Sequence, residues 1–125
     1  MKIDNITDHF KYNKNEFVRD TVIDSSHMLC FLLNLMPGQV VPQHRHGDSE
    51  GSAYIVKGSM LFTIGEKEVC MAEGDIISFN GSEMIGAKNN TGINASCMVT
   101  LCPNPGNGRD IQEIGFQSGE PYNNV

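Results

Sequence analysis

Short apolar segments separated by turn-forming residues constrain the fold of this chain more than any other feature of its sequence. Segments such as Phe17–Ile23, Ser59–Ile64 and Ile76–Phe79 are each followed directly by Gly, Asn or Asp. Apolar residues spaced three and four apart, which would indicate amphipathic helices, are scarce, whereas thirteen glycines supply turns. Strands that recur about every 8–12 residues are typical of a β-sandwich or a small barrel. We therefore expect an all-β protein.

The length of the chain allows one hydrophobic core. At 125 residues it is close to the commonest size of a single compact domain, and a second core is not expected. We divide it into an N-terminal arm with the first strand (residues 1–24), a barrel core (residues 25–102) and a loop-like C-terminal tail (residues 103–125). The interior should be lined by alternate residues of five segments: Leu29–Leu35, Ala53–Val56, Leu61–Ile64, Ile76–Phe79 and Ala95–Leu101.

Charge and hydropathy argue against two classes of partner. The formal net charge is −6, and basic residues such as Arg19 are interleaved with Glu16 and Asp20. No basic patch is therefore expected for nucleic acid or an anionic membrane. No apolar run approaches the roughly 18 residues of a membrane helix, and the first ten residues are polar where a secretory signal would be apolar. We expect a cytoplasmic protein without nucleic-acid or membrane partners.

The four cysteines show no CxxC spacing. They are Cys30, Cys70, Cys97 and Cys102. In a chain without an export signal, we expect reduced, buried thiols with a structural role rather than a disulfide framework.

The segment from Pro42 to Glu50 contains the residues best suited to chemistry. On an extended chain, residues two apart point to the same side and lie about 7 Å apart, so His44 and His46 can converge on one ion. Glu50, four residues further on, can add a carboxylate oxygen. Two imidazoles and one carboxylate leave coordination positions open for oxygen, water or substrate. We therefore predict a divalent transition-metal site formed by His44, His46 and Glu50.

Two sequence motifs follow one another along the chain. The first consists of Gly38, His44, His46, Glu50 and Tyr54–Gly58, and the second of Gly65, Gly74–Phe79 and Asn89. In their order and separation they resemble the two motifs of the cupin superfamily. The resemblance extends roughly from His27 to Leu101, more than half of the chain, and implies a double-stranded β-helix, or jelly-roll β-barrel. It also implies a homodimer, because small proteins of this superfamily commonly pair through an edge strand or terminal arms.

The chain departs from the pattern of that superfamily at two ligand positions. Ile85 stands where the second motif has a histidine, and Gly51 stands in the position of the first-motif glutamate, one residue beyond Glu50. A shift of one residue along a strand turns a side chain to the opposite face. Glu50 can therefore act as a ligand only if a bulge absorbs the offset, which Gly47 and Gly51 would permit.

Three outcomes remain open for the site. The first is an unusual metal site, completed by Glu50 and water or by a substitute ligand. The second is a metal-free barrel that binds a small molecule against a floor made more apolar by Ile85. In the third, His44 and His46 act as acid–base groups, because histidine titrates near neutrality. The substitute ligands that we consider are Cys97, His27 and Asp48.

The resemblance implies two functions of different kinds. One is a small protein that holds Fe, Mn, Ni or Zn and acts on a small organic substrate in a dioxygenase-, lyase- or isomerase-like reaction. The alternative is a metal-free binding or sensing module without catalysis. The lost histidine at Ile85 favours the second, and the His44–His46 pair favours the first. A small-molecule ligand or substrate is expected in both cases.

Overall fold

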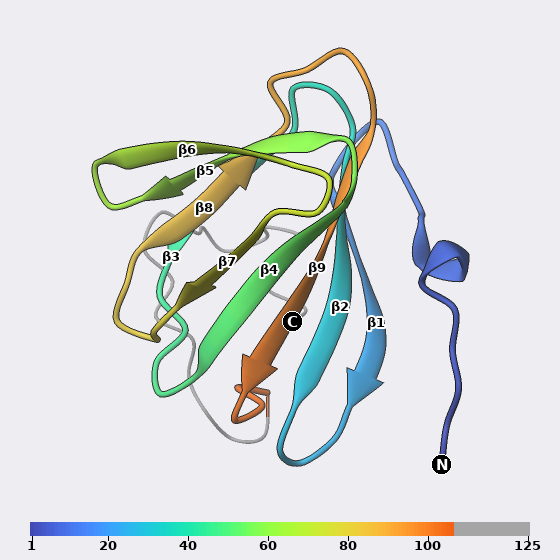
Figure 1. The fold of residues 1–125 in the computed structure, drawn as a ribbon, viewed down its shortest axis with the longest axis vertical. Coiled ribbons are helices and arrows are strands. Elements are labelled where there is room, and N and C mark those ends of the chain that lie inside the picture. The colour runs from blue at the N-terminus through green and yellow to red at the C-terminus, as the bar shows by residue number, and fades with distance from the viewer. Residues whose placement is uncertain (107–125) are drawn as a thin grey trace.

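A computed structural model describes residues 1–106 of the chain, which form nine strands and one short 3-10 helix. The helix η1 covers Ile6–His9, close to the N-terminus (Figure 1). The strands are β1 (Val18–Asp24), β2 (Leu29–Leu35), β3 (Val40–His44), β4 (Glu50–Lys57), β5 (Ser59–Ile64), β6 (Lys67–Ala72), β7 (Ile76–Phe79), β8 (Ile85–Lys88) and β9 (Ala95–Cys102).

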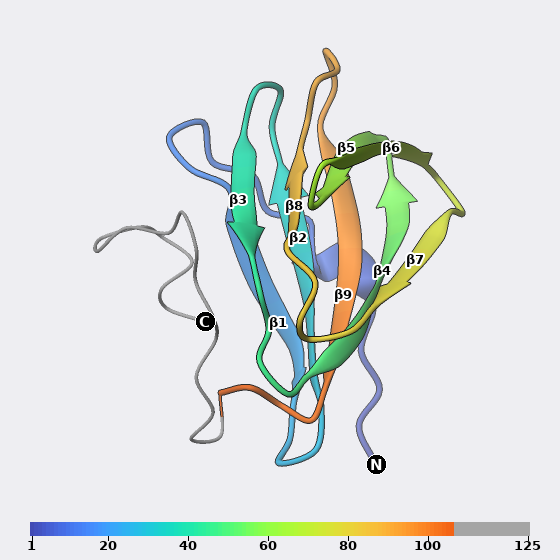
Figure 2. The same cartoon turned by 90° about the vertical axis from the view of Figure 1, so that its left-hand side faces the viewer.

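The strands form two antiparallel sheets that enclose a common interior (Figures 1 and 2). The larger sheet has the strand order β1-β2-β9-β4-β7, and the smaller has the order β3-β8-β5-β6. Strands distant in sequence are neighbours in space, as β2, β9 and β4 are, which is the connectivity of a jelly roll. The predicted all-β jelly-roll barrel is confirmed, and β5 and β7 have the predicted bounds.

Alternation of side chains along the strands builds the main core between the sheets. On β2, Phe31, Leu33 and Leu35 point inward, where they pack against residues such as Ile55 and Val99. Twelve of the eighteen buried residues of this core come from the five segments that the sequence predicted to line the interior. The other six, which the prediction missed, are Phe17, Val41, Met60, Met71, Ile85 and Ala87. Period-two patterning of apolar residues therefore identified much of the lining of the barrel, but it missed the contributions of β3, β6 and β8.

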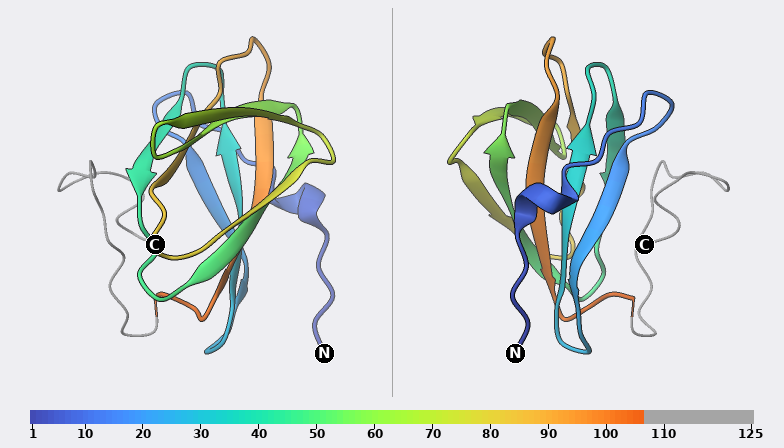
Figure 3. Two further views of the ribbon diagram at one scale, coloured as in Figure 1. Left: turned by 60° about the vertical axis from the view of Figure 1, so that its left-hand side comes forward. Right: turned by 90° about the vertical axis from the view of Figure 1, so that its right-hand side faces the viewer.

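Strand β2 is buried on both faces, which explains why six of its seven residues are apolar. All seven of its residues are buried. Its outward residues Cys30 and Leu32, with Val22 of β1, form a second apolar cluster, against which Ile6 and Phe10 of the N-terminal arm pack. The arm therefore crosses the outer face of the larger sheet (Figure 3).

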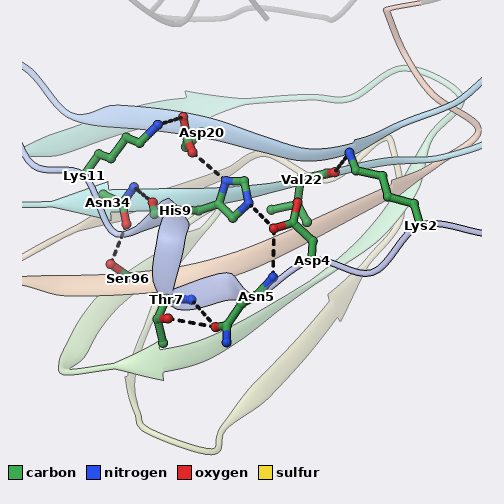
Figure 4. Close-up of polar contacts among 10 residues, drawn as sticks. All are labelled: Lys2, Asp4, Asn5, Thr7, His9, Lys11, Asp20, Val22, Asn34 and Ser96. Atoms are coloured by element: carbon green, nitrogen blue, oxygen red, sulfur yellow. Dashed lines mark hydrogen bonds and ion pairs between the residues drawn. The ribbon is translucent and has the colours of Figure 1, made fainter.

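Polar contacts hold the N-terminal arm in this position (Figure 4). The His9 ring lies between two carboxylates, with Nδ1 2.6 Å from Asp20 and Nε2 3.1 Å from Asp4. The buried Asn34 amide donates a hydrogen bond of 2.9 Å to the backbone carbonyl of His9, and Ser96 donates one of 2.6 Å to Asn34. The hydrogen bond to Asp20, and then that to Asp4, raises the pKa of His9.

The beginning of the predicted C-terminal tail packs against the barrel. Asn104 is buried, and its amide donates hydrogen bonds to the Asp24 carboxylate at 2.6 Å and to the Ser25 carbonyl at 2.7 Å. The rest of the predicted tail, residues 107–125, lies outside the described residues.

All four cysteines are free, but only Cys30 and Cys97 are buried, so the expectation of buried thiols was wrong for Cys70 and Cys102.

Candidate functional site

A cavity inside the barrel brings together two histidines and a predominantly apolar wall. About 60 Å³ of it is open to the centres of water molecules, which corresponds to room for on the order of five waters. Most of its lining is aliphatic or aromatic, and its polar side chains are an arginine and two histidines. The lining residues are Phe17, Arg19, Phe31, Leu33, Val41, His44, His46, Ala53, Phe62, Phe79, Ile85, Gly86, Ala87, Val99 and Leu101.

The two histidines are positioned by the end of β3 and the loop that follows it. His44 is the last residue of β3 and pairs with Ile85 of β8, after an irregularity in the register that begins at Val41. The backbone N–H of His46 donates a hydrogen bond of 3.0 Å to the carbonyl of Gly81. A side chain at position 81 would not fit, because its Cβ would lie 1.9 Å from the backbone oxygen of Gly47. Two glycine-containing loops thus meet closely behind His46.

The rings of His44 and His46 lie together, with their centroids 4.4 Å apart and their planes at 60°. Nδ1 of His44 is 3.0 Å from the Pro42 carbonyl; because a carbonyl only accepts, Nδ1 carries the proton and Nε2 the lone pair. The buried Nδ1 of His46 has no hydrogen-bond partner among the described residues. Such an orphaned polar atom, beside a cavity, is available to a bound group.

Both imidazoles are uncharged at neutral pH. Burial lowers the pKa of His44 to about 4, helped by the positive charge of Arg19, although the hydrogen bond to Pro42 opposes the shift. Burial, the neighbouring His44 and Arg19 lower the pKa of His46 to about 3. The desolvation of the charged form is the largest cause in each case.

Ile85 lies in the cavity, as its place in the sequence predicted. It is buried, lines the cavity and pairs directly with His44 across the β3–β8 ladder. The position where the resemblance implied a histidine is therefore occupied by an aliphatic side chain, and the floor of the cavity is apolar.

The structure does not bring Glu50 to the two histidines. Glu50 is exposed at the start of β4, and it lines an open groove that also includes Ser52 and Cys102 on the outer face of the larger sheet. Gly51 instead faces inward, where an added Cβ would lie 2.7 Å from Leu101 and 2.9 Å from Phe79. The shift of one residue seen in the sequence is thus retained on a regular strand, with no bulge at this point to absorb it.

The three substitute ligands considered for the site also lie elsewhere. Cys97 is completely buried on β9, where burial raises the pKa of its thiol to about 12, and it is not among the residues that line the cavity. His27 and Asp48 are exposed. Across residues 1–106, no three His, Cys, Asp or Glu side chains form a group that could hold a metal ion.

Sequence reasoning missed Arg19, the only cationic side chain among the lining residues from the described part of the chain. We expected it among interleaved surface charges. On β1, however, it pairs with Leu33 and points inward, with Cζ 3.8 Å from the centroid of the Phe31 ring. The signal was present in the segment Phe17–Ile23, where residues two apart share a face, so that Arg19 lies on the same side as the buried Phe17.

Comparisons with known proteins agree on the fold. The family model named "Cupin domain" matches residues 31–100, more than half of the chain. The structure of TT1209 from Thermus thermophilus is 28% identical in sequence, with a TM-score of 0.80, and the match covers 84% of this chain and 100% of that protein. An uncharacterised protein with a double-stranded β-helix domain from Klebsiella pneumoniae is 17% identical, with a TM-score of 0.80 and coverage of 91% and 99%.

Other similar structures have different names. KdgF from a Halomonas species is 16% identical, with a TM-score of 0.65, and the match covers 73% of this chain and 82% of that protein. At this identity the likeness extends to the fold and not to the activity. None of the curated protein sequences matches the chain significantly. No helix within residues 1–106 is long and apolar enough to span a membrane.

Proposed function

The chain belongs to the cupin family, and we propose that its barrel binds a small organic molecule in the cavity beside His44 and His46. One observation carries the proposal: an apolar cavity ends at two uncharged imidazoles, one of which has a buried nitrogen without a hydrogen-bond partner in the described chain. Ligand sites commonly combine apolar walls with a few placed polar groups.

The residues that line the cavity would contact different parts of a ligand. Side chains such as Phe31, Phe62 and Phe79 exclude water and take up the apolar part of a ligand. His44 contributes a neutral imidazole ring whose orientation is fixed by the contact of Nδ1 with the Pro42 carbonyl. His46 offers its orphaned nitrogen. The cavity is small, so a compact ligand is favoured.

The described residues do not fit a resident divalent metal. They offer two imidazoles, but Glu50 faces the outer groove and Ile85 occupies the fourth position. The positive charge of Arg19, which lowers the pKa of both histidines, also opposes a second cation beside them. The expected Fe, Mn, Ni or Zn site therefore remains a prediction to be tested, and we assign no reaction step to it.

The first experiment compares two neighbouring substitutions on β8. Ala87 lines the cavity, whereas the next residue, Lys88, is exposed. Ala87→Leu should fill the cavity, while Lys88→Leu adds the same side chain outside it. A library of neutral and charged fragments with up to about ten non-hydrogen atoms is then screened by saturation-transfer NMR.

We expect fragments to bind the unmodified protein and the Lys88→Leu variant, but not the Ala87→Leu variant. Thermal unfolding of both variants confirms that they are folded. Fragments that bind equally well to Ala87→Leu, or no binding by any fragment, would contradict the proposed function.

Elemental analysis of protein purified without an affinity tag, with a His44→Ala/His46→Ala variant as control, tests the metal site. Stoichiometric metal that is lost in this variant would overturn the metal-free interpretation.

A further inference from the structure

We propose that Arg19 makes the cavity specific for a small organic carboxylate, whose apolar body packs against the barrel wall. This inference rests on the proposed function and adds to it the chemical class of the ligand. It follows from the position of a guanidinium group that has no anionic partner in the described part of the chain.

The guanidinium of Arg19 is turned into the barrel. Arg19 lines the same cavity as His44 and His46, and its Cζ lies 3.8 Å above the ring of Phe31. A guanidinium has five N–H donors, yet within residues 1–106 no hydrogen bond or ion pair engages any donor of this one. The contact with the Phe31 ring stabilises the cation much less than an ion pair with a carboxylate would.

An unpaired charge in this environment is unfavourable for the protein. Burial lowers the pKa of Arg19 to about 10, so the group is still charged at neutral pH although it has lost much of its hydration. Charges removed from water are normally paired. The carboxylates of Asp4 and Asp20 are engaged by His9 on the outer face of the sheet, and no acidic residue of the described chain lines the cavity. A bound anion would supply the missing partner.

The shape and polarity of the cavity favour a carboxylate over other anions. A planar guanidinium pairs with a carboxylate through two parallel hydrogen bonds. Apart from the guanidinium, the only polar side chains of the described lining are the two neutral imidazoles. A phosphate dianion would therefore lose more hydration than the cavity can replace. The remaining walls are aliphatic and aromatic. Together they select a compact molecule with one carboxylate and an apolar body.

The test uses pairs of ligands with the same shape and different charge. Benzoate is compared with benzamide, and 3-methylbutanoate with 3-methylbutanamide; inorganic phosphate serves as a small anion without an apolar body. Dissociation constants are measured by calorimetry or by ligand-observed NMR for the unmodified protein, Arg19→Met and Lys88→Met. The two substitutions remove the same charge, but Lys88 is exposed outside the cavity.

We expect at least one carboxylate to bind more tightly than its amide. Arg19→Met should weaken carboxylate binding by roughly 10- to 100-fold, the range for hydrogen bonds to charged groups, and leave amide binding nearly unchanged. Lys88→Met should change neither. Arg19→Met should also unfold at the same temperature as the unmodified protein or higher when no ligand is present, because it removes a poorly solvated charge.

Several results would overturn the inference. Amides that bind as well as carboxylates, or carboxylate binding that survives Arg19→Met, would leave the proposed pocket intact but remove its specificity for acids. Tighter binding of phosphate than of any carboxylate would also refute it. A large fall in the unfolding temperature of ligand-free Arg19→Met would show that Arg19 has a structural role. If no organic probe of either charge binds, the proposed function fails as well.

Discussion

Acidification should destabilise this protein strongly because His44 and His46 are buried without charge. Their pKa values in the folded state are about 4 and about 3, below the ordinary value of 6.5. At a pH between the folded and unfolded pKa values, the histidines of the unfolded chain bind protons that those of the folded chain do not. The free energy of unfolding therefore falls as the pH is lowered through 6.5. At pH 5, which is 1.5 units below 6.5, each histidine costs about 2 kcal/mol, and the pair costs about 4 kcal/mol.

The assay is urea denaturation at pH 7, 6 and 5 in the presence of a chelator. The control is a His44→Phe/His46→Phe variant, which keeps two planar rings that do not titrate. Because the other ionisable groups are common to both proteins, the difference between their pH dependences isolates the two histidines. We expect the unmodified protein to lose about 4 kcal/mol more than the variant between pH 7 and pH 5. An equal loss in both proteins would refute the reasoning.

Three further predictions concern other parts of the molecule. The raised pKa of His9 means that its contribution to stability is present below pH 6.5 and is lost as the pH rises through its folded value; the protection of residues 5–12 against hydrogen exchange, measured relative to the base-catalysed rate of an unfolded peptide at the same pH, should therefore fall as the pH rises in the unmodified protein but not in His9→Gln. Leu32→Ala, at a completely buried position, should lower the free energy of unfolding by about 2–5 kcal/mol, whereas Cys70→Ala, at an exposed position, should change it by less than about 0.5 kcal/mol; chemical denaturation measures both. The homodimer implied by the family resemblance predicts twice the mass of the chain by light scattering at micromolar concentration, and a monomer mass would contradict it.

The fold was predictable because its information is local. The turn residues after Ile64 and Phe79 mark the ends of β5 and β7, and alternation along the strands assigns the inward-facing residues. The predominantly apolar sequence of β2 was harder to interpret, because both faces of this strand are covered. Its outer face is packed against Ile6 and Phe10 of a polar N-terminal segment, and no local pattern shows that this segment folds back.

The candidate site was predictable in part. The spacing of His44 and His46 suggested that both rings lie on the same side of the chain, and the structure places both rings and Ile85 in the lining of one cavity. The direction of the Glu50 side chain depended on whether the chain formed a bulge or continued as a regular strand. The pairing of β4 with β7 and β9 decides this, and the identity of residue 50 does not. Arg19 was missed because an arginine in a charged segment usually faces solvent. Its position on β1, two residues after the buried Phe17, nevertheless indicated that its side chain faces inward.

A measurement of the site itself tests the central claim most directly. The side-chain resonances of His46 and of the Arg19 Nε–H group can be followed by NMR while benzoate is added to the unmodified protein. We predict saturable shifts at both side chains, with little change at His9, which lies between Asp4 and Asp20 on the outer face of the sheet. The same titration is made with 3-methylbutanoate. If both carboxylates leave His46 and Arg19 unchanged, or shift only residues of the outer groove around Glu50, the account of this barrel as a binding site for small organic acids is contradicted.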